Sequence, residues 1–443
     1  MTQRRRNWML LGAAVLIFGA VLAWRLLFLP SALAFAGGHQ LDLSQYQGAP
    51  VTGVPVELVN ADPVTKGKYL AEATDCAACH TAKGGKRFAG GRPFKLPFGT
   101  IYTPNITPDR ATGIGAWTNA EFLRAVHKGI GRAGERLYPA FPYASYTLLT
   151  DTDVLAIRRY LGTIPAVRQK NIPNSFGFPF NQRWLMAIWG AFFNPNARFR
   201  PVAERSAQWN RGAYLVEAAG HCGECHTPRT LMQAMDTRRK FAGGQAEGWN
   251  AYNITSDRLS GVGAWSPEEL ASYLAKGHAP GHGVASGPMA EAVDLSTSRM
   301  TPTDIAAMVA YLRTIPPVSS KASPPMAGPA PVVASAGPSG NPAGKRLFEG
   351  ACASCHAWSG RGAVTPDQQL TGNRAVNDTS AANVAMMILN GIGSPEHNGA
   401  FMPSFRAAYS DEEIASVANY VTARFGAKPS RVAAADVRKM REE

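Results

Sequence analysis

All six cysteines of this 443-residue chain lie in three copies of one short pattern, Cys-x-x-Cys-His. This pattern is typical of c-type haem attachment, where two thiols form thioethers with the haem vinyl groups and the histidine binds the iron. The sequence therefore predicts three covalently bound haem c groups. The attachment pairs would be Cys76 and Cys79, Cys222 and Cys225, and Cys352 and Cys355, with His80, His226 and His356 as the proximal iron ligands.

Other uses of paired cysteines fit this pattern poorly. A structural zinc site gathers two Cys-x-x-Cys pairs, or one pair and distant histidines, around one metal. Here each pair carries its own adjacent histidine, in three separate places. A thioredoxin-like redox pair would need one copy only and would give no role to the histidine. Haem attachment is the interpretation that uses every residue of the pattern.

Two of the three sites have a methionine placed to bind the iron opposite the histidine. Cytochrome c iron usually takes methionine there, which raises the reduction potential. Met289 follows Pro288 and Met402 precedes Pro403, each shortly before the last predicted helix of its repeat. A generic methionine fills space in a core, but these positions favour ligation. We expect Met289 and Met402 to be the sixth ligands of the second and third haems.

The first site lacks such a methionine. No Met occurs between His80 and the helix expected after Thr150, and Phe141 stands where a ligand would belong. The first haem could be five-coordinate or water-bound, could take His127, or could take a residue that the pattern does not identify. His127 lies on a helix predicted over 119–128, where a core or surface histidine is the default. An open or bis-histidine first haem should have a lower potential than the other two.

Repeats around the motifs indicate three helical units. The matching segments 67–73 and 212–218 precede the first two motifs, and a shorter match at 344–349 precedes the third. Each unit also ends in a predicted amphipathic helix with a capping signal. The expected N-cap residues are Thr150, Thr301 and Ser410. The order is thus helix, haem motif, long glycine-rich loops and helix.

This order resembles the small all-α cytochrome c fold, in which the first and last helices cross. In that fold a glycine on the first helix allows close approach of an aromatic on the last. The candidate pairs are Gly67 with Tyr160, Gly212 with Tyr311, and Gly344 with Tyr420. The alternative is that each glycine only marks the beginning of a helix.

The expected fold class is all-α: three class I cytochrome c domains in tandem, preceded by one N-terminal hydrophobic helix. The expected layout is a signal or membrane anchor at 1–36, an N-terminal extension at 37–63, a first domain at 64–168, an aromatic insert at 169–205, a second domain at 206–318, a Pro/Ala-rich linker at 319–342, a third domain at 343–428 and a C-terminal tail at 429–443. We call residues 64–168, 206–318 and 343–428 the first, second and third units. The linker composition predicts a third unit that is docked less firmly than the other two.

The insert between the first two units is rich in Phe and Trp over 176–193. Three interpretations are open: a lid over a haem, a docking surface for another subunit, or a patch that contacts a membrane. We favour the lid. The apolar run 184–193 is too short to span a bilayer.

The N-terminus has the features of a targeting segment. Three arginines at 4–6 precede an uncharged apolar run at 8–24, and Arg25 is followed by further apolar residues ending in Ala34-Phe35-Ala36. A cleaved signal and an uncleaved anchor are both open, and we favour the anchor. Either would export the body to the outer side of the bacterial inner membrane, where haem is attached. The expected location is the inner (cell) membrane, on its periplasmic face.

The formal net charge is +14, partly from the N-terminal arginines. No block of Lys and Arg stands out, so we expect no nucleic-acid partner. We also find no nucleotide-binding glycine motif and no nucleophile–base pair, so no substrate chemistry of its own is expected.

With these features together, the chain closely resembles the triheme cytochrome c subunit of bacterial membrane-associated alcohol, aldehyde and gluconate dehydrogenase complexes. The resemblance covers nearly everything from about residue 64 onward. The specific stretches are 88–91, 97–102, 105–109, 137–139 and 206–217. The family commonly has Met where this chain has Phe141, so its His/Met ligation cannot be carried over to the first haem.

The resemblance implies an electron-transfer role. A dehydrogenase catalytic subunit, containing PQQ, flavin, or molybdenum with iron–sulfur clusters, would oxidise the substrate, and electrons would pass through the haems to ubiquinone in the membrane. The segment 178–181 favours an aldehyde enzyme over an alcohol enzyme, on resemblance alone. Two alternatives are a free periplasmic electron shuttle to a terminal oxidase and a peroxidase-like multihaem enzyme.

Overall fold

The computed structural model describes residues 3–28, 31–319, 340–393 and 401–442. The fold is mostly helical, as expected, but it also contains short antiparallel strands, so the all-α expectation needs correction. The strands are two to four residues long and lie within loops, where such short segments leave no clear alternating pattern in the sequence. One sheet has three strands in the order β1 (Pro93–Leu96), β2 (Gly99–Tyr102) and β3 (Ser175–Phe176). Two further sheets have two strands each: β4 (Gly244–Ala246) with β5 (Trp249–Ala251), and β6 (His278–Ala279) with β7 (Gly283–Val284).

The helices follow the repeats of the sequence. The N-terminal region contains α1 (Gln3–Phe28), η1 (Ala34–Ala36) and η2 (Val56–Leu58). The first unit and the insert contain α2 (Pro63–Ala73), α3 (Cys76–Cys79), α4 (Asn119–Lys128), α5 (Tyr143–Tyr146), α6 (Asp151–Leu161) and α7 (Leu185–Phe193). The second unit contains α8 (Ala207–Tyr214), η3 (Leu215–Ala219), α9 (Gly223–His226), η4 (Thr237–Arg239), α10 (Pro267–Lys276), α11 (Pro288–Leu295), η5 (Thr297–Arg299) and α12 (Pro302–Leu312). The third contains α13 (Pro342–Leu347), η6 (Phe348–Cys352), α14 (Ala353–His356), η7 (Pro366–Gln368), α15 (Ala382–Asn390), α16 (Asp411–Phe425) and α17 (Ala434–Glu442).

The predicted capping signals are present at the last helix of each unit. The hydroxyls of Thr150 and Thr301 accept hydrogen bonds from the backbone amides of Asp153 and Asp304, at 3.1 and 3.3 Å. Ser410 forms a full capping box with Glu413 at the start of α16. These caps satisfy amides of the first turn that have no partner within the helix. They fix where each final helix begins.

In each unit the first and last helices cross at the expected glycine. A Cβ built on Gly67 would lie 2.1 Å from the carbonyl oxygen of Ala156 and 2.9 Å from Cβ of Tyr160. The pairs Gly212 with Tyr311 and Gly344 with Tyr420 have the same arrangement, with Cβ–Cβ distances of 2.9 and 2.7 Å. The close-approach hypothesis is therefore confirmed, because no side chain larger than hydrogen fits at these crossings.

Gly212→Ala should destabilise the protein by ~1–3 kcal/mol, the usual cost of overpacking a tight contact. The added methyl group would lie 1.9 Å from the carbonyl oxygen of Ala307, so α8 and α12 would have to move apart. Urea denaturation measures the effect. Gly190→Ala on α7 is the control, because nothing lies within 4 Å of its added Cβ. The control should be neutral or slightly stabilising, and an equal loss in both variants would contradict the prediction.

The first two units exchange equivalent side chains across a pseudo-twofold interface. The Tyr69 hydroxyl on α2 donates to Asp304 on α12 at 2.6 Å and accepts from the amide of Thr301 at 3.3 Å. In the reciprocal contact, the Tyr214 hydroxyl on α8 donates to Asp153 on α6 at 2.5 Å and accepts from the amide of Thr150 at 3.2 Å. Each tyrosine thus binds the helix N-terminus of the other unit. The third unit has Arg346 at this helix position and cannot form the same contact.

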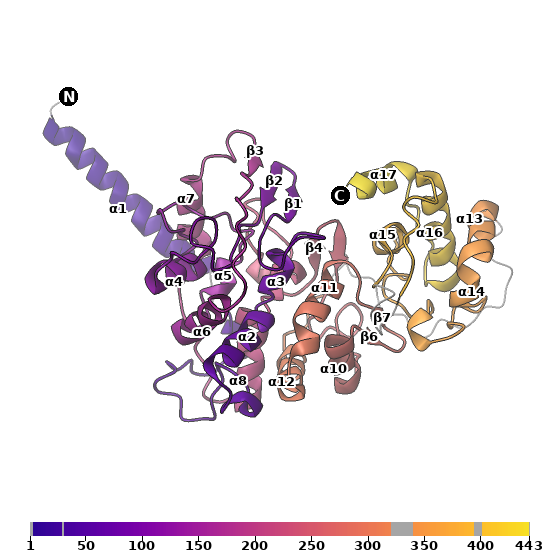
Figure 1. The fold of residues 1–443 in the computed structure, drawn as a ribbon, viewed down its shortest axis with the longest axis horizontal. Helices are drawn as coiled ribbons and strands as arrows, with labels where there is room; N and C mark the ends of the chain where they lie inside the picture. The colour runs from indigo at the N-terminus through magenta and orange to yellow at the C-terminus, as the bar shows by residue number, and fades with distance from the viewer. Residues whose placement is uncertain (1–2, 29–30, 320–339, 394–400, 443) are drawn as a thin grey trace.

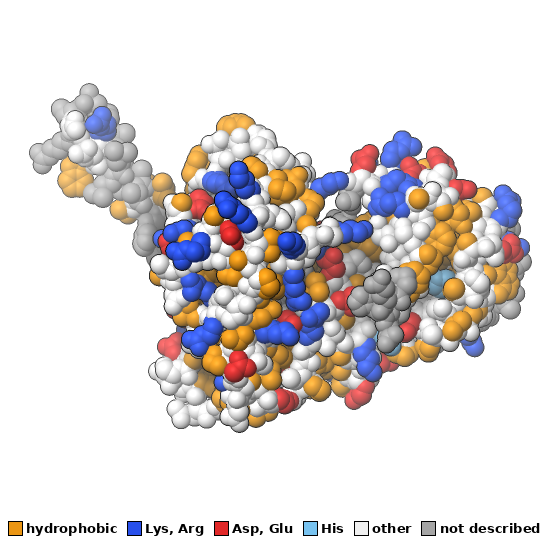
Figure 2. Space-filling view, in the orientation of Figure 1, with side chains coloured by type: hydrophobic (Ala, Val, Ile, Leu, Met, Phe, Trp, Pro, Cys, Tyr) orange, Lys and Arg blue, Asp and Glu red, His pale blue; other side chains and the backbone are white. Residues whose placement is uncertain are grey.

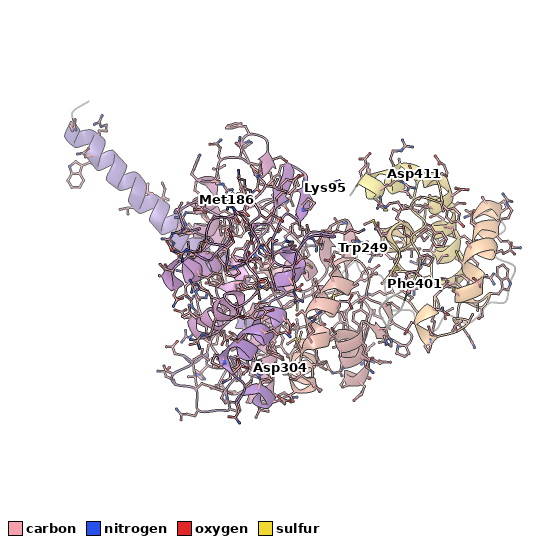
Figure 3. All side chains as sticks on the ribbon, viewed as in Figure 1. Lys95, Met186, Trp249, Asp304, Phe401 and Asp411 are labelled. Atoms are coloured by element: carbon pink, nitrogen blue, oxygen red, sulfur yellow. The ribbon has the colours of Figure 1, made fainter. Side chains whose placement is uncertain are left out.

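One buried ion pair breaks this symmetry. The Arg211 guanidinium binds both carboxylate oxygens of Asp304, at 2.8 and 2.7 Å, and Asp304 is fully buried. A third nitrogen of Arg211 donates to the carbonyl of Gly53 at 2.9 Å, which ties the N-terminal extension to the interface. In the first unit Lys66 occupies the matching position. Figure 3 places Asp304 low in the two-unit body, at the start of α12.

The third unit has a core of its own. One continuous apolar core runs through the first two units, whereas a second core is built from α15, α16 and neighbouring residues. Trp249 at the start of β5 is the residue of the second unit that enters this second core, and it lies at the junction of the two bodies (Figure 3). Figure 1 shows α13–α17 as a separate group beside the first two units. Linker residues 320–339 lie outside the described residues, so the expectation of a less firmly docked third unit stays a prediction.

The predicted N-terminal helix is present as α1, and its end packs against the insert. Trp24 meets Phe192 and Phe193 on α7 edge-on, with ring centroids 6.1 and 6.0 Å apart. Within residues 3–28, 31–319, 340–393 and 401–442, no helix combines the length and apolar composition needed to cross a bilayer.

Part of the insert covers α5, where Trp189 meets Tyr143 edge-on at 5.8 Å, while Phe178 remains exposed. Figure 2 shows that Lys and Arg side chains are spread over the face of the molecule that is turned to the viewer.

Candidate haem sites

The three motif histidines are oriented in the same way. Nδ1 of His80 lies 2.8 Å from the carbonyl oxygen of Pro104. Nδ1 of His226 lies 2.6 Å from the carbonyl oxygen of Tyr252, and Nδ1 of His356 lies 2.6 Å from that of Gln368. A carbonyl oxygen can only accept, so each Nδ1 must carry the proton and donate it. The lone pair of each neutral ring is then on Nε2. This is the tautomer that a metal-binding histidine needs, with the second nitrogen held by the backbone.

Burial also sets the protonation states of the motif residues. Burial lowers the pKa of His80, His226 and His356, which favours the neutral imidazole that binds metal. Burial raises the pKa of the Cys76 thiol to about 11 and that of Cys222 to about 12. These thiols are therefore protonated at neutral pH and are not poised as reactive thiolates.

The motif residues do not gather into a shared metal site. In the part of the chain that the structure describes, no group of three or more His, Cys, Asp or Glu side chains is arranged to hold an ion. Each Cys-x-x-Cys-His segment instead has its own separate position, which fits three separate groups.

The two methionines lie in segments that are fixed by close packing. Met289 is the second residue of α11, is half-buried and packs against the shared core of the first two units. Its loop is held at Gly287, where an added Cβ would lie 2.3 Å from the Trp249 ring. Met402 is half-buried against the core of the third unit and pairs with Ile392 through two backbone hydrogen bonds of 2.9 Å. Ligation by Met289 and Met402 stays a prediction.

Phe141 occupies the matching place in the first unit. It precedes α5 and packs against Tyr146, with ring centroids 5.6 Å apart. Tyr146 is buried, and its hydroxyl donates to the carbonyl of Thr74 at 2.6 Å, just before the first motif. The aromatic ring of Phe141 therefore lies in the loop that carries a methionine in the second unit.

His127 is buried on α4 with its two ring nitrogens in different surroundings. Nδ1 lies 2.6 Å from Nη2 of Arg198 and 3.7 Å from the Asp151 carboxylate. Because a guanidinium can only donate, Nδ1 accepts and the proton of the neutral ring is on Nε2. Burial, and next the Arg198 charge, lower the pKa of His127 to about 4, so the ring is neutral. This tautomer is opposite to that of the three motif histidines, and within the described residues the buried Nε2 of His127 has no hydrogen-bond partner. Iron ligation by His127 stays a prediction.

The first two motifs each pack against the ligand loop of the other unit. The carboxylate of Glu224, inside the second motif, accepts from the Ser145 hydroxyl at 2.8 Å, and the ring of His221 lies 5.2 Å from that of Tyr146. In return, Arg92 donates to the carbonyl of Ala78 inside the first motif at 2.8 Å and binds Glu291 on α11 at 2.5 Å. Groups attached at these two motifs would therefore be close neighbours.

The second site contains a buried donor without a partner. Trp265 is 5 % exposed, and within the described residues its indole Nε1–H has no hydrogen-bond acceptor. Its ring stacks on His282 at 3.9 Å and meets Tyr273 edge-on at 5.5 Å. An unpaired buried N–H is costly, and a haem propionate is an acceptor that would satisfy it. The residues around the second motif therefore fit a bound haem.

The sequence did not identify the residues that orient the histidines. Three backbone carbonyls, of Pro104, Tyr252 and Gln368, perform this function. A carbonyl has no side-chain signature, although the repeated Asn-Ile-Thr that follows Pro104 and Tyr252 marks the position in two units.

Comparison with protein families gives one match, to the cytochrome c family, over residues 64–165 and 342–424. These ranges contain the first and third motifs. The second motif lies outside the matched ranges, and its similarity to the others rests on the repeats and on the geometry described above.

Comparison with characterised proteins gives several relatives. The chain is 41% identical over 390 residues to a nicotinate dehydrogenase subunit of Pseudomonas putida, covering 86% of this chain and 32% of that protein. It is 35% identical over 400 residues to the gluconate 2-dehydrogenase cytochrome c subunit of Pantoea cypripedii, covering 86% and 90%. It is 36% identical over 400 residues to the alcohol dehydrogenase (quinone) cytochrome c subunit of Komagataeibacter europaeus, covering 86% and 84%. The chain thus spans nearly the whole length of two of these relatives but about a third of the nicotinate dehydrogenase protein.

Proposed function

Because the chain belongs to the cytochrome c subunits of dehydrogenase complexes, we propose that it carries three covalent haem c groups and passes electrons from a periplasmic dehydrogenase to ubiquinone. The dehydrogenase would oxidise an aldehyde or an alcohol. Haem c supplies one-electron redox chemistry when bound. The residues of this chain attach, orient and tune it.

The observation that carries the proposal is the threefold repetition of one histidine arrangement. Each motif histidine directs Nδ1 to a backbone carbonyl and leaves Nε2 free for a metal. A structural role for these histidines would give no reason for the same tautomer three times beside a cysteine pair. The repetition supports three haems, including one at the second motif, which the family match does not cover.

The packing of the first two motifs supports electron transfer between them. Ser145 of the first unit binds Glu224 in the second motif, and Arg92 links the first motif to Glu291 of the second unit. The shared core and the reciprocal tyrosine contacts keep this arrangement rigid. A rigid separation between redox groups is what an electron carrier needs, because the protein otherwise only sets orientation and potential.

We further propose that the protein works at the periplasmic face of the inner membrane, with residues 1–36 as its targeting and anchoring segment. The arginines before the apolar run and the haem-attachment motifs support export. The partners would be the dehydrogenase catalytic subunit and ubiquinone. Separating periplasmic and membrane fractions tests the location, and recovery of all the protein in the soluble periplasm would contradict it.

The test is to isolate the chain from detergent-solubilised membranes together with its bound proteins. We expect three haems per chain from the alkaline pyridine spectrum and a dehydrogenase subunit in the same complex. An aldehyde or alcohol should reduce the haems, and a soluble ubiquinone should reoxidise them. Gluconate, fructose and nicotinate serve as alternative donors.

Several outcomes would overturn the proposal. Two haems per chain would show that one of the three motifs is not an attachment site. Isolation as a single polypeptide that exchanges electrons only with a terminal oxidase would favour a free shuttle. Rapid turnover of hydrogen peroxide by the isolated chain would favour a peroxidase-like enzyme.

A further inference from the structure

Arg374, in the third unit, is a buried charge that faces the second unit. It is 6 % exposed, and Nη1 donates to the carbonyl of Asn253 at 3.2 Å. The centre of its guanidinium lies 5.0 Å from the centroid of the Tyr252 ring. Asn253 and Tyr252 belong to the segment whose carbonyl holds His226. An arginine of one unit thus reaches the segment that orients the iron ligand of another.

The remaining donors of this guanidinium have no partner. Within the described residues, Nε and Nη2 of Arg374 form no hydrogen bond. The nearby Asp378 carboxylate accepts from Asn250 at 2.9 Å and from Tyr252 at 3.1 Å instead. A buried charge with unpaired donors is unfavourable unless a ligand compensates it. The side chain of Arg374 is therefore suited to bind an anion.

The position of Arg374 links it to the second motif. Nδ1 of His226 lies 2.6 Å from the carbonyl oxygen of Tyr252, and the ring of the same tyrosine faces the Arg374 guanidinium. Tyr273 also interacts electrostatically with Arg374, and its ring adjoins Trp265, the other buried donor without a partner. The unpaired donors of Arg374 and Trp265 thus belong to the surroundings of one motif, the second.

We propose that Arg374 of the third unit binds a propionate carboxylate of the haem attached at Cys222 and Cys225, and thereby completes the second haem site across the junction between units. The inference goes beyond the proposed function, and rests on it only in that a haem is bound at the second motif.

Completion of the site from another unit has a functional consequence. A cation near the haem, and neutralisation of a propionate, both favour the reduced iron, which carries one positive charge less. Docking of the third unit then raises the potential of the second haem. Residues 249–252 also hold the third unit in place. Trp249 packs into the core of the third unit, the amide of Asn250 donates to Asn383 at 2.8 Å, and the Tyr252 hydroxyl donates to Asp378. Docking and redox tuning therefore depend on the same few residues.

The experiment compares Arg374→Gln, Arg374→Lys and Arg431→Gln in the full-length holoprotein. Arg431 is an exposed arginine of the C-terminal tail and serves as the matched control. Haem content per chain is measured first, so that a failure of haem binding at the second motif is separated from a failure of this inference. Potentials are then measured by spectroelectrochemical titration, and resonance Raman spectroscopy monitors the propionate bending modes.

We expect Arg374→Gln to disfavour reduction of one haem about tenfold, which corresponds to ~59 mV for a one-electron couple. Arg374→Lys should retain most of the effect of the charge, and Arg431→Gln should leave all three potentials unchanged. The propionate modes of one haem should shift in Arg374→Gln only. A Cys225→Ser background identifies that haem, because loss of one thioether shifts the absorption band of the second haem alone.

Three results would overturn the inference. Unchanged potentials and propionate modes in Arg374→Gln would show that no haem carboxylate is bound. A shift of the third haem instead of the second would assign Arg374 to its own unit. An equal shift of all three haems together with a lower melting temperature would show a purely structural role.

Discussion

Replacing Met289 with leucine should lower the reduction potential of one haem by on the order of 100 mV, since axial ligands alone can move haem potentials over ~0.8 V. Met289 lies at the start of α11, half-buried against the core that the first two units share. Leucine matches methionine in volume, so packing should change by less than ~1.5 kcal/mol. The variant would remove the sulfur that favours reduced iron. A redox titration followed in the visible bands of each haem measures the shift.

The first unit supplies the reciprocal experiment. Phe141 occupies the corresponding loop, in contact with Tyr146 beside the first motif. Phe141→Met should place a thioether there and raise the potential of the first haem, which we expect to be the lowest of the three in the wild type. Opposite shifts in Met289→Leu and Phe141→Met would identify two haems by their ligands in one pair of experiments.

Met300→Leu is the matched control, because Met300 packs partly buried against the same core but outside the loop. Its potentials should equal those of the wild type. Wild-type behaviour in Met289→Leu would show that the sixth ligand of the second haem is another residue. Three equal, high potentials in the wild type would contradict the special position of the first haem.

The structure shows which features of the site can be predicted from local sequence. Helix caps such as Thr150 and close-approach glycines such as Gly67 follow short-range rules of spacing and size, and both predictions are confirmed. The haem motifs are equally local. By contrast, the carbonyl of Tyr252 that holds His226 lies on a different segment of the chain, and its role depends on the path of a loop.

Contacts between units could not be predicted from the sequence. Nothing in the local pattern around Arg374 shows that it is buried against the second unit, because an isolated arginine is most often exposed. The same holds for Tyr69 and Asp304, which are 235 positions apart and meet only through the pseudo-twofold arrangement. Repeats reveal that two units are alike, but not which faces they present to each other.

Asp304→Asn should destabilise the first two units by ~3–5 kcal/mol, the typical cost of leaving a buried ion without its partner. The side chain keeps its shape but loses its charge. Arg211 is 7 % exposed and would then retain a positive charge with neutral acceptors only, namely the amide oxygen introduced at position 304 and the carbonyls of Gly53 and Val51. The hydrogen bond from the Tyr69 hydroxyl would also weaken, because its acceptor would be neutral.

Urea denaturation should resolve this effect, because the first two units and the third have separate cores. We expect the transition of the first two units to move to lower urea concentration, while that of the third remains in place. Glu413→Gln is the matched control. Glu413 occupies the same helix position in the third unit, where it completes an exposed capping box instead of a buried ion pair.

The control should cost no more than ~1 kcal/mol, the usual value for a capping interaction. Both variants neutralise an acidic residue in the first turn of a helix, so the difference between them isolates the buried ion pair. Equal losses in both would mean that the Arg211–Asp304 pair contributes nothing beyond a first-turn acid. In that case the shared core and the remaining contacts between the units, such as that of Tyr214 with Asp153, would hold the first two units together.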